Sequence, residues 1–212
     1  MGFGLLFIGY FFFTYVLPLQ LQFLSIAAAI IFFALKRLSV YHDDFRRAMY
    51  LTPLLILAGA PDILRMLLPA GFAAPFENTV LLYICSLVAW MTLFFFHFLL
   101  FTAIAELAKG AGILRLRVAA VRNRLFTCIF CAIRFSLQCL ESTVPVKVYA
   151  YLLIGIIIFG LLISILNTFM LYGAYRQFCP VGQERAGITE YQKFIDSNME
   201  KLKSKKGGKR DE

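Results

Sequence analysis

A long apolar run extends from Val148 to Tyr172 and contains no charged residue. A helix over these 25 residues would be about 37 Å long, enough to cross a hydrocarbon core of about 30 Å with some tilt. Tyrosines flank both ends of the run, where their rings favour the headgroup level of a bilayer. The pattern therefore predicts a membrane-spanning helix.

Five further apolar segments precede this run. The first two share the charge-free stretch Gly2–Leu35, which one helix would extend to about 50 Å, so a turn at Pro18 is expected to divide it. We predict an all-α integral membrane protein, a six-transmembrane-helix bundle with short loops. Its spans are Gly4–Leu17, Gln22–Leu38, Ala48–Leu68, Thr79–Ala105, Leu125–Val144 and Val148–Tyr172.

Charge placement gives the bundle an orientation. The connections Lys36–Arg47 and Lys109–Arg124 and the tail after Tyr175 hold eighteen Lys and Arg residues, whereas the opposite connections hold only Lys147. Basic residues gather on the cytoplasmic side, so both termini are predicted to be cytoplasmic. The predicted organisation is a membrane domain over residues 1–175 and a basic cytosolic tail over 176–212.

Composition agrees with this class. The chain is 61% hydrophobic and 16% charged, which is too apolar for a soluble domain. Its net charge of +9 lies at the predicted membrane boundaries, so the partner that it indicates is a lipid bilayer and not nucleic acid. We predict a multi-pass protein of the cytoplasmic membrane, with an internal membrane such as the endoplasmic reticulum as the alternative.

Ionisable residues inside the spans are costly and indicate a site. Arg134 lies near the middle of the fifth predicted span, with Gln138 one turn further on, and Asp62 and Arg65 lie in the third. We predict an Arg134–Asp62 contact, with Arg65 and Gln138 lining the same polar site. Two alternatives stay open for the third span: a helix broken at Pro61 that lines a cavity, or a short interfacial helix with an Asp62–Arg65 pair.

A second polar group is predicted in the inner half of the bundle. His97 shares a face of the fourth span with Trp90, and Gly160, Ser164 and Asn167 form a small polar stripe on the sixth. A hydrogen bond between Asn167 and His97 would hold these helices together, as polar side chains commonly do between membrane helices.

Cys128 and Cys131 form a CxxC motif in the fifth span. Such a pair is typical of thiol-redox enzymes, but two cysteines in an apolar run more often serve as small packing residues. The sequence holds no catalytic motif, no metal-ligand spacing and no cofactor-binding loop, so no catalytic residue, metal or cofactor is predicted.

The tail carries an amphipathic pattern over about residues 189–205. Apolar residues recur at helical spacing and form one stripe, made of Tyr191, Phe194, Ile195, Met199 and Leu202. The predicted helix either rests on the membrane or the bundle, or docks a cytosolic or membrane protein partner, and an oligomer is a further alternative.

Three functional classes follow. The first is a non-catalytic sensor, accessory or scaffold subunit that acts through its cytosolic tail. The second is a small-solute transporter, or a subunit of one, built around Asp62, Arg65, Arg134 and Gln138. The third is a membrane thiol-redox enzyme that uses Cys128 and Cys131.

Overall fold

The structure is a computed structural model that describes residues 2–16, 24–67, 79–141 and 143–178, except for some side chains near the helix ends. The described part is all-α and contains six helices. In chain order they are α1 (Gly2–Val16), α2 (Leu24–Leu38), α3 (Asp43–Leu67), α5 (Thr79–Gly110), α6 (Leu114–Cys139) and α7 (Val146–Phe178).

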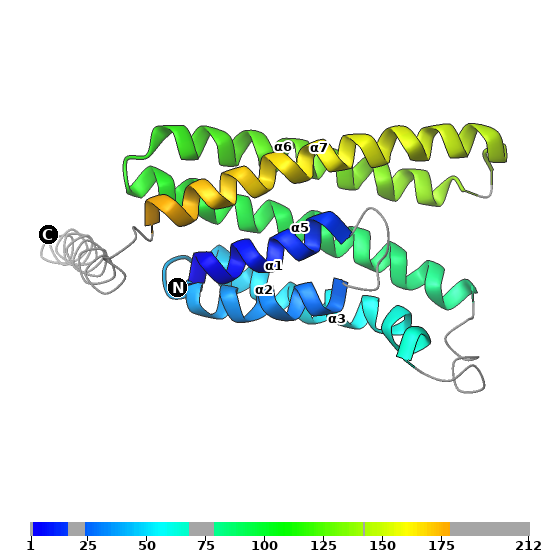
Figure 1. Cartoon of the computed structure of the whole chain (residues 1–212), viewed down its shortest axis with the longest axis horizontal. Helices are drawn as coiled ribbons and strands as arrows, with labels where there is room; N and C mark the ends of the chain where they lie inside the picture. Colours follow the sequence, from blue (N-terminus) through cyan, green and yellow to red (C-terminus); the bar gives the residue numbers. More distant parts are fainter. Residues whose placement is uncertain (1, 17–23, 68–78, 142, 179–212) are drawn as a thin grey trace, which may run out of the picture.

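The six helices form a closed ring. Each packs on the helix before it and the helix after it, and α1 packs on α7 to complete the circuit. Figure 1 shows α6 and α7 along one side, α5 in the middle, and α1, α2 and α3 on the other side. The beginning of α1 and the end of α7 lie at the same end of the bundle, where Phe3 stacks on Phe178 at 5.1 Å between ring centroids.

The first two helices are short. Each contains 15 residues, or about 22 Å by helical rise, whereas α7 contains 33 residues. The expectation that the first apolar stretch would form two helices is confirmed, and the predicted turn at Pro18 lies outside the described residues.

Helix α3 is continuous through Pro53 and Pro61, so of the two alternatives for the third span the helix broken at Pro61 is contradicted. Proline lacks the N–H that would bond the carbonyl four residues earlier. For Pro53 that carbonyl belongs to Met49, and the Thr52 hydroxyl donates to it at 2.7 Å. The side chain therefore replaces the missing backbone donor, as occurs where proline is tolerated within membrane helices.

A glycine brings α3 close to α2. A Cβ atom on Gly59 would lie 2.7 Å from Ser25 Oγ, so only glycine fits at this approach. Ser25 Oγ donates a hydrogen bond to the carbonyl of Ile56 at 2.7 Å. This bond joins the two helices next to the Pro61 turn of α3.

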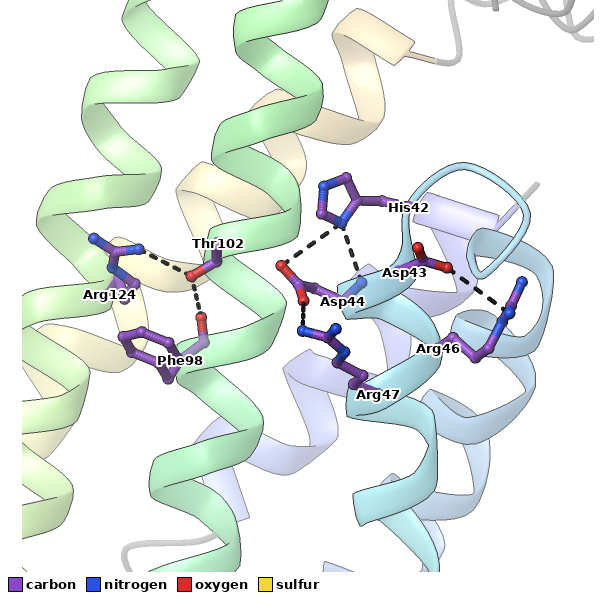
Figure 2. Close-up of polar contacts among 8 residues, drawn as sticks. All are labelled: His42, Asp43, Asp44, Arg46, Arg47, Phe98, Thr102 and Arg124. Carbon is purple, nitrogen blue, oxygen red and sulfur yellow. Dashed lines mark hydrogen bonds and ion pairs between the residues drawn. The ribbon is translucent and has the colours of Figure 1, made fainter. Parts of the chain in front are cut away.

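Charged residues close the α2–α3 turn (Figure 2). His42 Nδ1 accepts the backbone N–H of Asp44 at 3.1 Å and so caps the N-terminus of α3. The Asp44 carboxylate also lies 3.7 Å from the same ring nitrogen. Arg46 pairs with Asp43 at 3.8 Å and Arg47 with Asp44 at 3.1 Å.

The turn between α5 and α6 is tighter than the sequence pattern indicated. Gly112 has φ of 72°, and the N–H of Ile113 bonds the carbonyl of Ala108 at 2.8 Å, the pattern of a glycine-terminated helix. Helix α6 begins at Leu114 and ends at Cys139, so the predicted bounds Leu125–Val144 are wrong. Arginines propagate a helix well, and the basic segment is therefore its first three turns.

Two of the described helices are long and apolar enough to cross a membrane, Val80–Gly110 within α5 and Val146–Phe178. Helices α1 and α2 are short, and α3 and α6 carry charged residues along their length. An association with membranes is therefore indicated by two helices, and the six-span count stays a prediction.

Candidate functional site

Four helices, α1, α5, α6 and α7, line a cavity of about 140 Å³. This volume is close to that of an engineered cavity of about 150 Å³ that binds benzene. No described residue of α2 or α3 lines it. The wall consists of Tyr10, Phe13, Trp90, Leu93, His97, Thr127, Phe130, Cys131, Arg134, Leu153, Ile156, Ile157, Gly160, Ser164 and Asn167.

Asn167 forms one polar end of this cavity. Its side chain is 1% exposed, and Nδ2 donates to the Tyr10 hydroxyl at 2.8 Å and to the Thr127 hydroxyl at 2.9 Å. These two bonds tie α7 to α1 and to α6. The Asn167 Oδ1 atom is buried and has no hydrogen-bond partner in the described part of the chain. A buried carbonyl oxygen without a donor is costly, so this atom favours a donor from a bound molecule or from water.

His97 stands beside this end of the cavity. Its Nδ1 lies 2.8 Å from the carbonyl of Leu93, and because a carbonyl only accepts, we assign the proton to Nδ1. In the neutral ring Nε2 is then an acceptor. Aromatic rings surround the imidazole at centroid distances of 5.3 to 5.7 Å, those of Tyr10, Phe13, Phe96 and Phe101.

Arg134 forms the other polar end. Its guanidinium lies 5.4 Å from the centroid of Trp90, and this cation–π contact stabilises a partly desolvated charge. Its Nη1 is buried without a hydrogen-bond partner, and no ion pair to Arg134 is present among the described residues. Among the described residues, the cavity therefore presents a positive donor without a counter-ion.

The two polar ends are separated along the bundle axis. Thr127 and Arg134 are seven residues apart on α6, which corresponds to about 10 Å of helical rise. Apolar side chains, including Leu93, Phe130 and Ile157, line the space between these levels. The arrangement suits a small molecule with an acid group at Arg134 and an apolar body.

A close approach of α6 and α7 shapes the wall. A Cβ atom on Gly160 would lie 2.8 Å from the Phe130 ring, so glycine lets that ring lie against α7. The other side of the Phe130 ring meets Trp90 edge-on at 6.0 Å between centroids. The Trp90 ring that contacts the Arg134 guanidinium is therefore held in place by Phe130.

The structure brings some of the predicted site residues together and separates others. His97, Ser164 and Asn167 line the same cavity, but Asn167 bonds Tyr10 and Thr127 instead of His97. Gln138 does not line it, since its Oε1 accepts the Ser86 hydroxyl at 3.0 Å and joins α5 to α6.

The side chains of Asp62 and Arg65 lie outside the described part of the structure, so the Arg134–Asp62 contact stays a prediction. Arg134 lies five residues, or about 7 Å, from the end of α6, because this helix ends at Cys139 and not at the predicted Val144.

The two cysteines of the CxxC motif face different spaces. Cys131 is 2% exposed and lines the cavity, whereas the half-buried Cys128 lines a groove on the outer surface. Both are free thiols. This placement favours packing roles and gives the redox hypothesis no support.

Tyr10 and Thr127 were not recognised from the sequence. Each is a hydroxyl-bearing residue within an apolar run, Tyr10 in GLLFIGYFFF and Thr127 in LFTCIF. A tyrosine far from a predicted membrane boundary was the available signal, because a buried hydroxyl requires a partner.

No group of His, Cys, Asp or Glu among the described residues could hold a metal ion. The predicted tail helix lies outside the described residues, and so do Tyr191, Phe194, Ile195, Met199 and Leu202. No protein-family model, curated protein or solved structure matches this chain.

Proposed function

We propose that this chain is a six-span integral membrane protein with cytoplasmic termini that binds a small amphipathic acid between its helices. The observation that carries the proposal is the cavity whose two polar ends hold buried and unpartnered atoms, Arg134 Nη1 and Asn167 Oδ1. We favour the role of a non-catalytic sensor, and a transporter subunit is the second candidate.

Exposed apolar surface supports the membrane location. Only 17% of the most apolar stretch of α7 is buried, and large apolar side chains such as Ile158, Leu162 and Phe169 point outward. Contiguous apolar surface on this scale is rare on soluble monomers and typical of a surface that meets lipid. Exposed apolar residues also occur on α1, α2, α3, α5 and α6, which favours insertion of the whole bundle.

Two polar contacts between α5 and α6 support a defined position of these two helices along the membrane normal. Ser86 bonds Gln138 near one end, and Thr102 accepts a hydrogen bond from Arg124 at 2.9 Å near the other. The 16 residues from Ser86 to Thr102 rise about 24 Å, close to the hydrocarbon thickness. The basic α5–α6 turn would then emerge on the cytoplasmic side.

The position of α7 supports the sensor role. Asn167 on α7 contacts the cavity, and the same helix continues to Phe178 at the end of the bundle where α1 begins. A molecule that accepts a hydrogen bond from Arg134 and donates one to Asn167 would contact both α6 and α7. A movement of α7 on ligand binding would be transmitted to the tail that follows this helix.

The orientation is tested by cysteine labelling. In a cysteine-free background, Ser39→Cys and Ala111→Cys should react with a membrane-impermeant maleimide only from the cytoplasmic side, and Thr143→Cys only from the opposite side. All three positions lie at turns or helix ends in the described structure. Labelling of all three from one side would overturn the six-span arrangement.

Ligand binding is tested with benzoate, whose ring matches the cavity size. Trp90 is the only tryptophan of the chain and touches the Arg134 guanidinium, so its fluorescence should report binding. We expect a saturable change with benzoate and an apparent affinity about ten- to a hundredfold weaker for neutral benzamide, since a charge-assisted bond is lost.

Substitutions test whether the benzoate response arises at the Arg134 cavity. Arg134→Gln should abolish the benzoate response, and the control Arg115→Gln should keep it, because Arg115 does not line the cavity. Equal responses to benzoate and benzamide, or a response that survives Arg134→Gln, would contradict the proposed site. Uptake of benzoate into vesicles that carry the protein would identify a transporter, and binding without uptake would identify a sensor.

A further inference from the structure

A second hollow, which we call the α5–α6 groove, lies on the outer face of the bundle. Its apolar lining residues include Phe98, Val118, Val121 and Leu125, each at least 41% exposed. Three arginines line it as well. The whole lining consists of Phe94, Phe98, Leu114, Arg117, Val118, Val121, Arg122, Arg124, Leu125 and Cys128.

Arg124 is held in place within this groove (Figure 2). Its Nη1 donates to the Thr102 hydroxyl at 2.9 Å, and Thr102 in turn donates to the carbonyl of Phe98 at 2.6 Å. The guanidinium lies 5.2 Å from the centroid of the Phe98 ring. A guanidinium has five N–H donors, so Arg124 keeps donors for a further acceptor while its position is fixed.

The positive charge of the groove is not neutralised by the described residues. Glu106 is the only acidic residue of the sequence 79–139, and it pairs with Lys109 at 3.5 Å. None of the described ion pairs includes Arg117, Arg122 or Arg124. The groove therefore complements an anionic partner.

The arginines lie at one end of the groove, and its apolar lining continues beyond them. Arg117 and Arg122 lie between Arg124 and the α5–α6 turn, as do the apolar Leu114, Val118 and Val121. Cys128 and Phe94 lie about 6 and 12 Å further from that turn than Arg124 and Thr102 by helical rise, and no arginine lines that part. A phospholipid has the same order, with its phosphate at the headgroup level and its acyl chains deeper. A soluble anion would not use the apolar half.

We propose that the α5–α6 groove binds an anionic glycerophospholipid of the inner leaflet. Its phosphate contacts Arg124 together with Arg122 and Arg117, and one acyl chain lies against Leu125 and Phe94. Basic hollows between helices on the cytoplasmic side suit such headgroups. The assignment rests on the membrane orientation given under the proposed function, but it does not depend on the cavity at Arg134.

Quenching by brominated lipids tests this site. The double variant Trp90→Phe/Phe94→Trp moves the only tryptophan into the groove, and it is reconstituted into phosphatidylcholine vesicles. Small amounts of phosphatidylglycerol with brominated acyl chains should quench the introduced tryptophan more strongly than equal amounts of brominated phosphatidylcholine. Arg117→Gln, Arg122→Gln and Arg124→Gln should each lower the relative affinity by up to about fivefold, the contribution of one basic residue near an anionic surface.

Arg115→Gln is the matched control, since Arg115 belongs to the same basic segment but does not line the groove. It should leave the preference unchanged. Equal quenching by both lipids, or equal losses in Arg115→Gln and Arg124→Gln, would overturn the site. Loss of the preference on addition of glycerol phosphate would assign the arginines to a soluble phosphate and would also overturn it.

Extraction with alkaline carbonate separates this inference from the proposed function. Protein that leaves the vesicles in carbonate is not integral, and both proposals would then fail. Protein that stays in the vesicles without a lipid preference would overturn only the lipid site.

Discussion

The two faces of α6 place arginines in opposite surroundings. Arg124 on the outer face bonds Thr102 and lies over Phe98 in a groove. Arg134 lines the cavity, where its Nη1 is buried without a partner among the described residues and its guanidinium lies over the Trp90 ring. One helix thus carries an arginine held by a side-chain hydrogen bond in an outer groove, and a second arginine at the cavity whose buried Nη1 has no partner among the described residues.

This difference indicates different reasons for the two charges. A charge at a membrane boundary is inexpensive, because headgroups and water reach it. A buried and unpartnered donor is expensive, and a cavity beside it indicates that a bound molecule offsets the cost. Substitutions on the cavity side of the bundle should therefore have larger effects than matched substitutions on its outer side.

The largest effect is expected at Asn167. Asn167→Leu removes two buried hydrogen bonds and leaves the hydroxyls of Tyr10 and Thr127 without this donor. We expect a loss of about 2–4 kcal/mol in the free energy of unfolding, measured in detergent by denaturant titration. Thr102→Val on the outer face should cost less than about 1 kcal/mol, because Thr102 is only partly buried and water can replace its contact with Arg124. Equal losses for both variants would contradict the distinction between the faces.

Two glycines of α7 give a comparison within one helix. Gly160→Ala places a Cβ atom 2.8 Å from the Phe130 ring, and overpacking of this kind costs about 1–3 kcal/mol. Gly155 has no neighbouring atom within 4 Å, so Gly155→Ala should stabilise the helix by about 0.5–1 kcal/mol. Thermal unfolding in detergent would show shifts of opposite sign. A Gly160→Ala variant as stable as Gly155→Ala would show that Phe130 moves freely and that the cavity wall is soft.

Much of the fold could be predicted from the sequence, because it depends on local patterns. Apolar runs set the number and order of the helices, and the divided first stretch followed from its excessive length for one helix. The bounds of α6 could not be read from the same pattern. Charged residues continue a helix as well as apolar ones, so the segment Arg115–Arg124, which the charge pattern predicts as part of a connection, is helical.

The candidate site was predicted only in part, because it depends on contacts between distant helices. The cost of a buried charge selected Arg134, and small polar spacing selected Ser164 and Asn167. The partner of Asn167 is Tyr10, 157 residues earlier, and no local pattern joins these positions. Tyr10 reaches Asn167 because α1 packs against α7 and closes the circle of helices.

The next smaller effect compares the two arginines directly. Arg134→Met removes a partly desolvated charge and fills the space with an apolar side chain, so it should raise the free energy of unfolding by about 1–2 kcal/mol. Arg124→Met should lower it by less than about 1 kcal/mol. The measurement is chemical denaturation of both variants at one detergent concentration. A loss of about 3–5 kcal/mol in Arg134→Met would instead indicate a buried ion pair, as predicted with Asp62, and would contradict the comparison.

The smallest effect is a difference in thiol labelling that leaves stability almost unchanged. The chain has five cysteines, and two variants that each keep only Cys128 or only Cys131 would be treated with a maleimide in detergent. Cys128 is half-buried in the groove and should react under native conditions, whereas Cys131 is 2% exposed and should react only after denaturation, because labelling follows exposure. The native chain with both thiols should form no Cys128–Cys131 disulfide under mild oxidation, since the two side chains line different spaces. In vesicles, anionic lipid should slow the labelling of Cys128 and leave that of Cys131 unchanged. Rapid labelling of Cys131, or a disulfide between Cys128 and Cys131, would show that Cys131 also reaches the outer surface of α6. Either result would restore the redox hypothesis.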